Sequence, residues 1–102
     1  MDAFTALVEP NRRLLLDAIR VRPSTVNMLV ETAGLSQPAV SKHLKVLRQA
    51  KLVTVRPDGQ KRWYCLNPAP LQELETYLEP YRQFLNDRLD GLERYLDQMQ
   101  AP

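Results

Sequence analysis

The sequence predicts a mainly α-helical fold that contains one small β-hairpin and ends in one long helix. Apolar residues recur at helical spacing in the first half, and leucines recur every seven residues near the C-terminus. Between these parts, an Asp-Gly pair separates two runs rich in β-branched and aromatic residues. With 102 residues, 44% of them hydrophobic, the chain can build one modest core, so we expect a single domain over residues 1–102.

The first half is expected to hold a short N-terminal helix over residues 1–8 and a helical core over residues 10–50. Pro10 suits the first turn of a helix, where its missing N–H costs nothing. The apolar spacing after it continues to about Val21, just before the next proline. This pattern predicts the first helix of the core.

Two further helices follow with only a short turn between them. Thr25 can cap the first, and Gly34 can supply the left-handed residue that ends it. Ser36 can cap the second, which runs to about Ala50. Two helices joined by so short a glycine-containing turn form a helix-turn-helix.

A β-hairpin is predicted over residues 52–66. Its strands are Leu52 to Arg56 and Arg62 to Leu66, joined by a turn over residues 57–60. Trp63 and Tyr64 alternate across the second strand, so one of them should pack inward rather than stack on bases. A basic hairpin directly after a helix-turn-helix is a wing, and the predicted architecture is therefore a winged helix-turn-helix with a long C-terminal dimerisation helix.

The last helix is predicted over residues 68–99. About 28 residues at about 1.5 Å each give some 42 Å, more than so small a domain can cover, so part of its apolar face needs a second subunit. The alternative is that it folds back as core, and Pro80 should kink it or split it in two. The candidate dimerisation residues are apolar and lie on this helix or on the first one: Phe4, Leu7, Leu71, Leu74, Leu78, Tyr81, Leu85, Leu89, Leu92 and Leu96.

Charge is segregated along the chain despite a net charge of only +2. Residues 1–66 carry eleven Lys and Arg against five Asp and Glu, whereas residues 67–102 carry three against seven. Within residues 36–62, seven cations stand against Asp58 alone. This concentration favours a polyanionic partner such as double-stranded DNA, although a solvated basic surface would show the same composition.

The helix from Ser36 has the properties of a DNA-reading helix. Its apolar residues share one stripe, and the opposite face is short, polar and cationic, which suits the major groove. The candidate DNA-binding residues of this helix are Ser36, Gln37, Pro38, Ala39, Ser41, Lys42, His43 and Lys45. His43 lies toward the edge of the buried stripe, so both packing and DNA contact remain open. On the wing, Arg56, Lys61 and Arg62 are expected to contact the DNA backbone or the minor groove.

Four segments together resemble the ArsR family of bacterial repressors. They are Glu-Pro-Asn-Arg-Arg at 9–13, Gly-Leu-Ser-Gln-Pro-Ala-Val-Ser-Lys-His-Leu at 34–44, Leu-Val at 52–53 and Gly-Gln-Lys-Arg-Trp-Tyr at 59–64. The resemblance covers nearly the whole chain, and it implies a winged helix-turn-helix homodimer that occludes a promoter, often that of its own operon. Two-fold symmetry would demand a near-palindromic operator. The alternative is a winged-helix module that binds proteins without specific DNA recognition.

The chain departs from the metal-sensing members of that family. Where many relatives carry cysteines in the first helix of the helix-turn-helix, this chain has residues 26–29, Val-Asn-Met-Leu, and its last helix has no histidine. We therefore expect no metal site and no cofactor, and the resemblance names no inducer. One histidine, one cysteine and three glycines leave no enzyme motif to argue from.

Localisation follows from what the ends and the hydropathy of the sequence contain. No apolar run approaches the ~18 residues of a membrane span, and the N-terminal residues do not read as a signal peptide. The lone Cys65 suits a reducing compartment. We expect a cytoplasmic protein without membrane contact.

Overall fold

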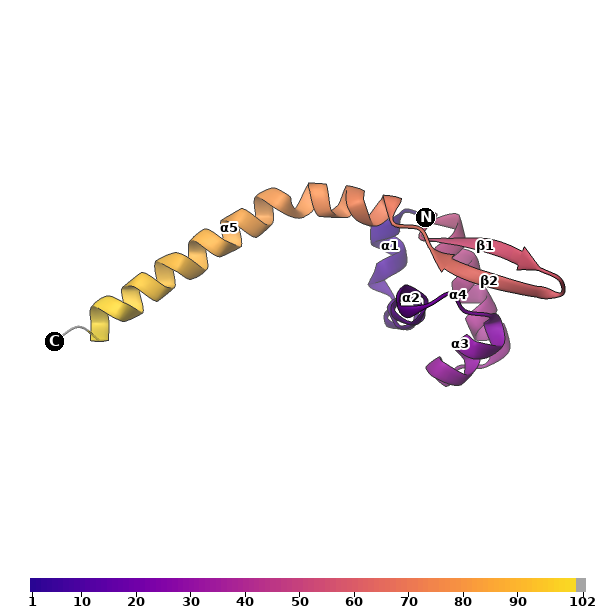
Figure 1. The fold of residues 1–102 in the computed structure, drawn as a ribbon. Helices are drawn as coiled ribbons and strands as arrows, with labels where there is room; N and C mark the ends of the chain where they lie inside the picture. The colour runs from indigo at the N-terminus through magenta and orange to yellow at the C-terminus, as the bar shows by residue number, and fades with distance from the viewer. Residues whose placement is uncertain (101–102) are drawn as a thin grey trace. The chain divides into compact units, whose positions relative to one another are not determined.

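The computed structural model describes residues 1–100, and its main-chain elements follow the predicted order (Figure 1). The elements are α1 (Ala3–Val8), α2 (Pro10–Val21), α3 (Val26–Ala33), α4 (Gln37–Gln49), β1 (Val53–Asp58), β2 (Lys61–Leu66) and α5 (Ala69–Gln100). Residues 1–72 form one compact unit, and the remainder of α5 forms another. The predicted fold class, mainly α with one hairpin and a long last helix, is confirmed.

Side-chain caps fix where the helices of the first unit begin. The Met28 amide donates to the Thr25 hydroxyl at 3.3 Å, and the Ala39 amide donates to the Ser36 hydroxyl at the same distance. Gly34 ends α3 in the left-handed conformation, with φ of 67°. All three predicted caps are confirmed, and they set the short turn between α3 and α4.

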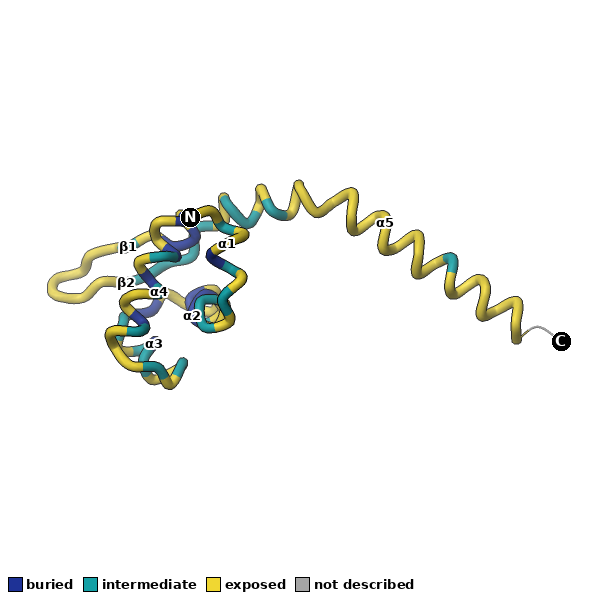
Figure 2. Tube along the Cα trace, turned by 180° about the vertical axis from the view of Figure 1, so that it is seen from behind, coloured by how far each residue is buried: buried dark blue, intermediate teal, exposed yellow. Residues whose placement is uncertain are grey.

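The core of the first unit takes side chains from each of the first four helices and from β1 (Figure 2). The predicted apolar stripe of α4, made of Val40, Leu44 and Leu47, is buried throughout. Leu29 of α3 is likewise fully buried. Burial of this stripe fixes the rotation of α4, so its polar face must point outward.

The strands of the hairpin are each one residue longer than predicted, and the turn between them comes one residue later. Asp58 pairs with Lys61, so only Gly59 and Gln60 form the loop, whereas we expected the turn to occupy residues 57–60 and the first strand to end at Arg56. Gly59 supplies a positive φ of 62° at the first loop position. Pro57 is tolerated inside the strand because a two-stranded sheet has no central strand to interrupt.

The junction between α4 and the wing has a feature without a sequence signal. Lys51 adopts a left-handed conformation with φ of 63°, the conformation that glycine usually supplies after a helix. The Lys51 amide donates to the Arg48 carbonyl and the Leu52 amide to the Leu47 carbonyl, both at 3.0 Å. The Asn67 side-chain amide donates to the Lys51 carbonyl at 2.7 Å. These bonds hold the strained residue and set the direction in which the wing leaves α4.

The last helix is continuous through Pro80 over its 32 residues. Of the two alternatives left open for Pro80, the split is therefore excluded, and Figure 1 shows a bend in the helix axis within its orange part, the kink that a proline in a helix produces. Of the residues Ala69–Gln100, none is buried. Along residues 1–100, no helix is both long and apolar enough to cross a membrane.

Candidate nucleic-acid interface

The outward face of α4 gathers most of the predicted DNA-reading residues. Six of them are exposed and one, Ala39, is half-buried. The exposed residues are Ser36, Gln37, Pro38, Ser41, Lys42 and Lys45. Because the opposite stripe is buried in the core, these side chains share the outward face of α4, and most of them are polar or cationic.

His43 is the exception among these candidates. Its side chain is only 17% exposed, and its Nδ1 lies 3.8 Å from Oε2 of Glu9. This Nδ1 is buried and finds no hydrogen-bond partner within residues 1–100. The same Glu9 oxygen accepts the Arg12 amide at 2.9 Å and so caps α2. This placement favours the packing alternative for His43, as a link between α4 and the start of α2.

The wing places its cations in the open. Arg56, Lys61 and Arg62 are all exposed, beside the exposed loop of Gly59 and Gln60. Their spacing along two paired strands keeps three positive charges on one narrow hairpin. A hairpin of this kind can follow the phosphate backbone with little dependence on sequence.

Two arginines of the first half serve another purpose. Arg12 Nε donates to the Ala6 carbonyl at 2.6 Å, and Arg13 donates to the Leu7 and Val8 carbonyls at 2.7 and 3.1 Å. Both guanidinium groups thus satisfy carbonyls at the end of α1. These two side chains are therefore held at the junction of α1 and α2, away from the cations of residues 36–62 along the sequence.

The wing is anchored by a contact that the sequence did not reveal. Ser24, which is 3% exposed, forms an isolated antiparallel bridge with Tyr64 of β2. The Ser24 amide donates to the Tyr64 carbonyl at 3.1 Å, and the Tyr64 amide donates back at 2.8 Å. Tyr64 also packs partly on the core, so it is the inward aromatic of the pair. Because a bridge at a single residue has no periodicity, no sequence pattern predicted the contact between Ser24 and Tyr64.

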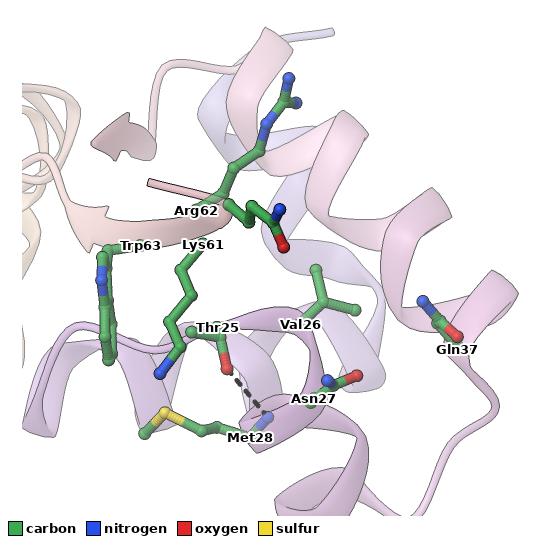
Figure 3. Close-up of a pocket in the computed structure, with 9 residues that line it drawn as sticks. Thr25, Val26, Asn27, Met28, Gln37, Lys61, Arg62 and Trp63 are labelled. Atoms are coloured by element: carbon green, nitrogen blue, oxygen red, sulfur yellow. Dashed lines mark hydrogen bonds between the residues drawn. The ribbon is translucent and has the colours of Figure 1, made fainter. Parts of the chain in front are cut away.

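A pocket of about 490 Å³ opens between the first turn of α3, the start of α4 and β2 (Figure 3). Trp63 and Met28 line it, and Lys61 extends over it from the wing while Arg62 points away. Gln37, a candidate base-reading residue, lines the side that belongs to α4. The pocket therefore overlaps the candidate DNA-binding surface at Gln37, Lys61 and Arg62.

The candidate dimerisation residues fall into two groups. Leu7 and Leu71 pack partly on the core of the first unit, and Leu74 is half-buried. The remaining candidates are large apolar side chains that are 46–63% exposed: Phe4, Leu78, Tyr81, Leu85, Leu89, Leu92 and Leu96. On α5 this row is widened by a tilted pair of Tyr77 and Tyr81 rings, 5.5 Å between centroids. An exposed apolar row of this extent is typical of an interaction surface.

Potential metal ligands are dispersed over the part of the chain that the structure describes. Within residues 1–100, no three His, Cys, Asp or Glu side chains lie close enough to hold a metal ion. Cys65 is half-buried in β2, with its Sγ 3.9 Å from the Trp63 carbonyl.

Comparison with known proteins gives consistent matches. The family described as bacterial regulatory protein, arsR family, matches residues 9–55, which span α2, the helix-turn-helix and the start of the wing. The HTH-type transcriptional regulator Rv2034 of Mycobacterium tuberculosis is 38% identical over 93% of this chain and 86% of that protein. The transcriptional repressor SdpR of Bacillus subtilis is 33% identical over 71% of this chain and 80% of that protein.

Solved structures match the fold as well. The crystal structure of a possible transcriptional regulator for arsenical resistance is 37% identical, with a TM-score of 0.71, over 92% of this chain and 95% of that chain. The crystal structure of NolR from Sinorhizobium fredii is 34% identical, with a TM-score of 0.64, over 76% of this chain and 79% of that chain. The whole fold, including the wing, is thus one that such regulators adopt.

Proposed function

Because this chain belongs to the ArsR family of bacterial regulatory proteins, we propose that it represses transcription by binding a near-palindromic operator as a homodimer. The observation that carries this proposal is the outward face of α4, which exposes polar and cationic side chains and is fixed in rotation by the buried stripe behind it. A non-enzymatic regulator needs such a reading surface and no reaction centre.

The proposed reading residues are Gln37 and Ser41, supported by Pro38 and Ala39. Their side chains are short or carry donors and acceptors for base edges, so the backbone of α4 can approach the floor of the major groove. Lys42 and Lys45 lie farther along the same face, where their ammonium groups would reach phosphates. His43, held against Glu9, would keep α4 in place instead of reading bases.

The wing would add affinity that does not depend on sequence. Each of Arg56, Lys61 and Arg62 can neutralise one phosphate and release a condensed counterion, so binding should weaken steeply with salt. Because the Ser24–Tyr64 bridge ties β2 to the loop before α3, the wing and the reading helix would approach DNA together.

The proposed dimer interface is the exposed apolar row on α5, and the exposed Phe4 of α1 is a further candidate. A second copy would cover side chains that water otherwise surrounds, and each buried Å² of apolar surface contributes about 25 cal/mol. An isologous dimer would present two reading helices about 34 Å apart, one turn of DNA. Because the dimer is two-fold symmetric, the operator must contain two inverted half-sites.

The position of the operator in the genome would show which genes the protein regulates. We place the protein in the cytoplasm, with the promoter of its own operon as the first target to examine. Selection of bound fragments from genomic DNA, followed by footprinting, tests the proposal. The expected result is a footprint with two inverted half-sites about 10 base pairs apart. Equal retention of all fragments, or no salt-dependent retention at all, would contradict specific DNA binding and favour a protein-interaction module.

A further inference from the structure

The pocket beside the wing has a lining that DNA alone does not explain. Trp63, Val26 and Met28 are half-buried there and present an indole ring, a branched alkyl group and a thioether. A phosphate backbone is bound by cations and N–H donors, and these three side chains offer it little. Their polarisable, apolar surfaces match the face of a flat organic molecule instead.

The charge of the residues that line the pocket determines which charge on a flat ligand is favoured. Lys61 extends over it toward Met28, close to the Trp63 ring (Figure 3). None of the nine described residues that line the pocket is acidic. The first turn of α3 also forms part of the wall, and the N-terminal end of a helix favours negative charge. A small anion is therefore preferred over a neutral or cationic ligand.

We propose that this pocket is an effector site for a small planar aromatic carboxylate, which packs against Trp63 and pairs its charge with Lys61. Its volume of about 490 Å³ lies within the range of sites that take small ligands. The proposal rests on the proposed function, because the effect of the ligand is to release the operator.

Release follows from shared residues. Gln37 and Lys61 line the pocket and also belong to the proposed DNA-binding surface. A carboxylate on Lys61 would neutralise a charge that DNA needs, and a ligand in the pocket would occupy space beside the proposed DNA-binding surface. If the carboxylate and the operator exclude each other, the apparent dissociation constant of the operator is its true value multiplied by a factor. This factor is one plus the carboxylate concentration divided by the dissociation constant of the carboxylate.

The experiment uses the full chain and 2-naphthoate as the probe. Trp63 is the one tryptophan in the sequence, so its indole N–H gives a single, assignable NMR signal beside the pocket. We expect 2-naphthoate to shift this signal saturably and to weaken operator binding in proportion to its occupancy. The neutral 2-naphthamide, of the same shape, should bind at least about tenfold more weakly, because it lacks the charge.

A matched pair of variants places the probe. Residue 28 is the third residue of α3 after the Thr25 cap, a position that accepts both Glu and Gln, so the helix should remain intact in either variant. Met28→Glu puts a carboxylate into the pocket and should weaken 2-naphthoate binding at least about tenfold relative to Met28→Gln. Equal affinity of the two variants would overturn the assignment to this pocket.

The remaining outcomes separate this inference from the function on which it rests. An unshifted Trp63 signal at millimolar 2-naphthoate, in a protein that still binds its operator, overturns the effector site and leaves the repressor intact. A saturable shift without loss of operator binding overturns the release mechanism. Failure to bind any operator overturns the proposed function, and with it the regulatory role of the pocket, even if the probe binds.

Discussion

The two units of this chain are ordered by different means. Residues 1–72 bury a shared core, with Leu15, Leu29 and Leu47 among its fully buried side chains. The unit that begins at Glu73 consists of one helix without a buried residue, although leucines recur along it. The first unit is stabilised by its own buried core. The second unit exposes apolar side chains, which a second chain would cover in the proposed dimer. Mutations should therefore act on folding in one unit and on association in the other.

The largest expected effect is on association. Replacing both Leu85 and Leu92 by Asp puts charges into the exposed apolar row and should give monomers in analytical ultracentrifugation. Loss of the second half-site contact should weaken operator binding by at least about 100-fold. The matched control adds the same charge on the polar face through Gln83→Asp and Asn86→Asp, and it should remain dimeric. A dimer that persists in the first variant would refute the proposed interface.

The next effect sharpens the contrast in folding. Leu47→Ala removes a fully buried side chain from the first unit and should lower the free energy of unfolding by about 2–5 kcal/mol. Leu89→Ala, on α5, should change it by less than about 0.5 kcal/mol at concentrations where the chain is monomeric. Urea denaturation followed by Trp63 fluorescence reports the first unit in both cases. Similar losses from the two substitutions would mean that the two units fold as one.

A smaller effect distinguishes sequence-specific base contacts from phosphate contacts on the surface of the first unit. Ser41→Ala should weaken operator binding by about 1 kcal/mol and leave random DNA nearly unchanged, because one base-edge hydrogen bond is lost. Lys45→Ala should weaken both and reduce the salt slope by about one, since one phosphate contact disappears. Fluorescence anisotropy across a salt series measures both. Equal losses on the two DNAs for Ser41→Ala would remove Ser41 from the reading residues.

The smallest effect concerns the strained residue after α4. Lys51→Gly should raise the free energy of unfolding by about 0.5–1 kcal/mol, because glycine adopts a positive φ without a Cβ penalty. Lys51→Ala removes the same charge and keeps the Cβ, so thermal unfolding of the two variants isolates the backbone term. A gain in both would assign the effect to charge instead.

Periodicity and turn chemistry were enough to predict the elements of the fold. Buried stripes such as that of Val40 and Leu44 repeat over several turns, and caps such as Ser36 have a local mechanism, so both are readable from sequence. The turn of the wing was misplaced by one residue, because residues 57–60 were assigned to it and Pro57 and Asp58 instead pair with the second strand. In a sheet of only two strands, this proline interrupts nothing.

The features that escaped prediction depend on tertiary contacts. Lys51 is left-handed because bonds to Asn67 and α4 hold it there, and lysine itself signals nothing of the kind. The bridge between Ser24 and Tyr64 joins residues forty positions apart. The burial of His43 against Glu9 depends on how α2 meets α4, which the spacing of residues within one helix does not show. A pocket formed by three elements has no sequence pattern at all.

The uncovered row on α5 has a consequence for dosage. Under the proposed dimer, active repressor forms by mass action from two chains, so below the dimerisation constant its amount rises with the square of chain concentration. An operator upstream of the gene for this chain would then respond with a threshold instead of in proportion. The chain concentration at which this threshold lies would be set by the apolar side chains of α5, which are far in sequence from the residues proposed to contact DNA.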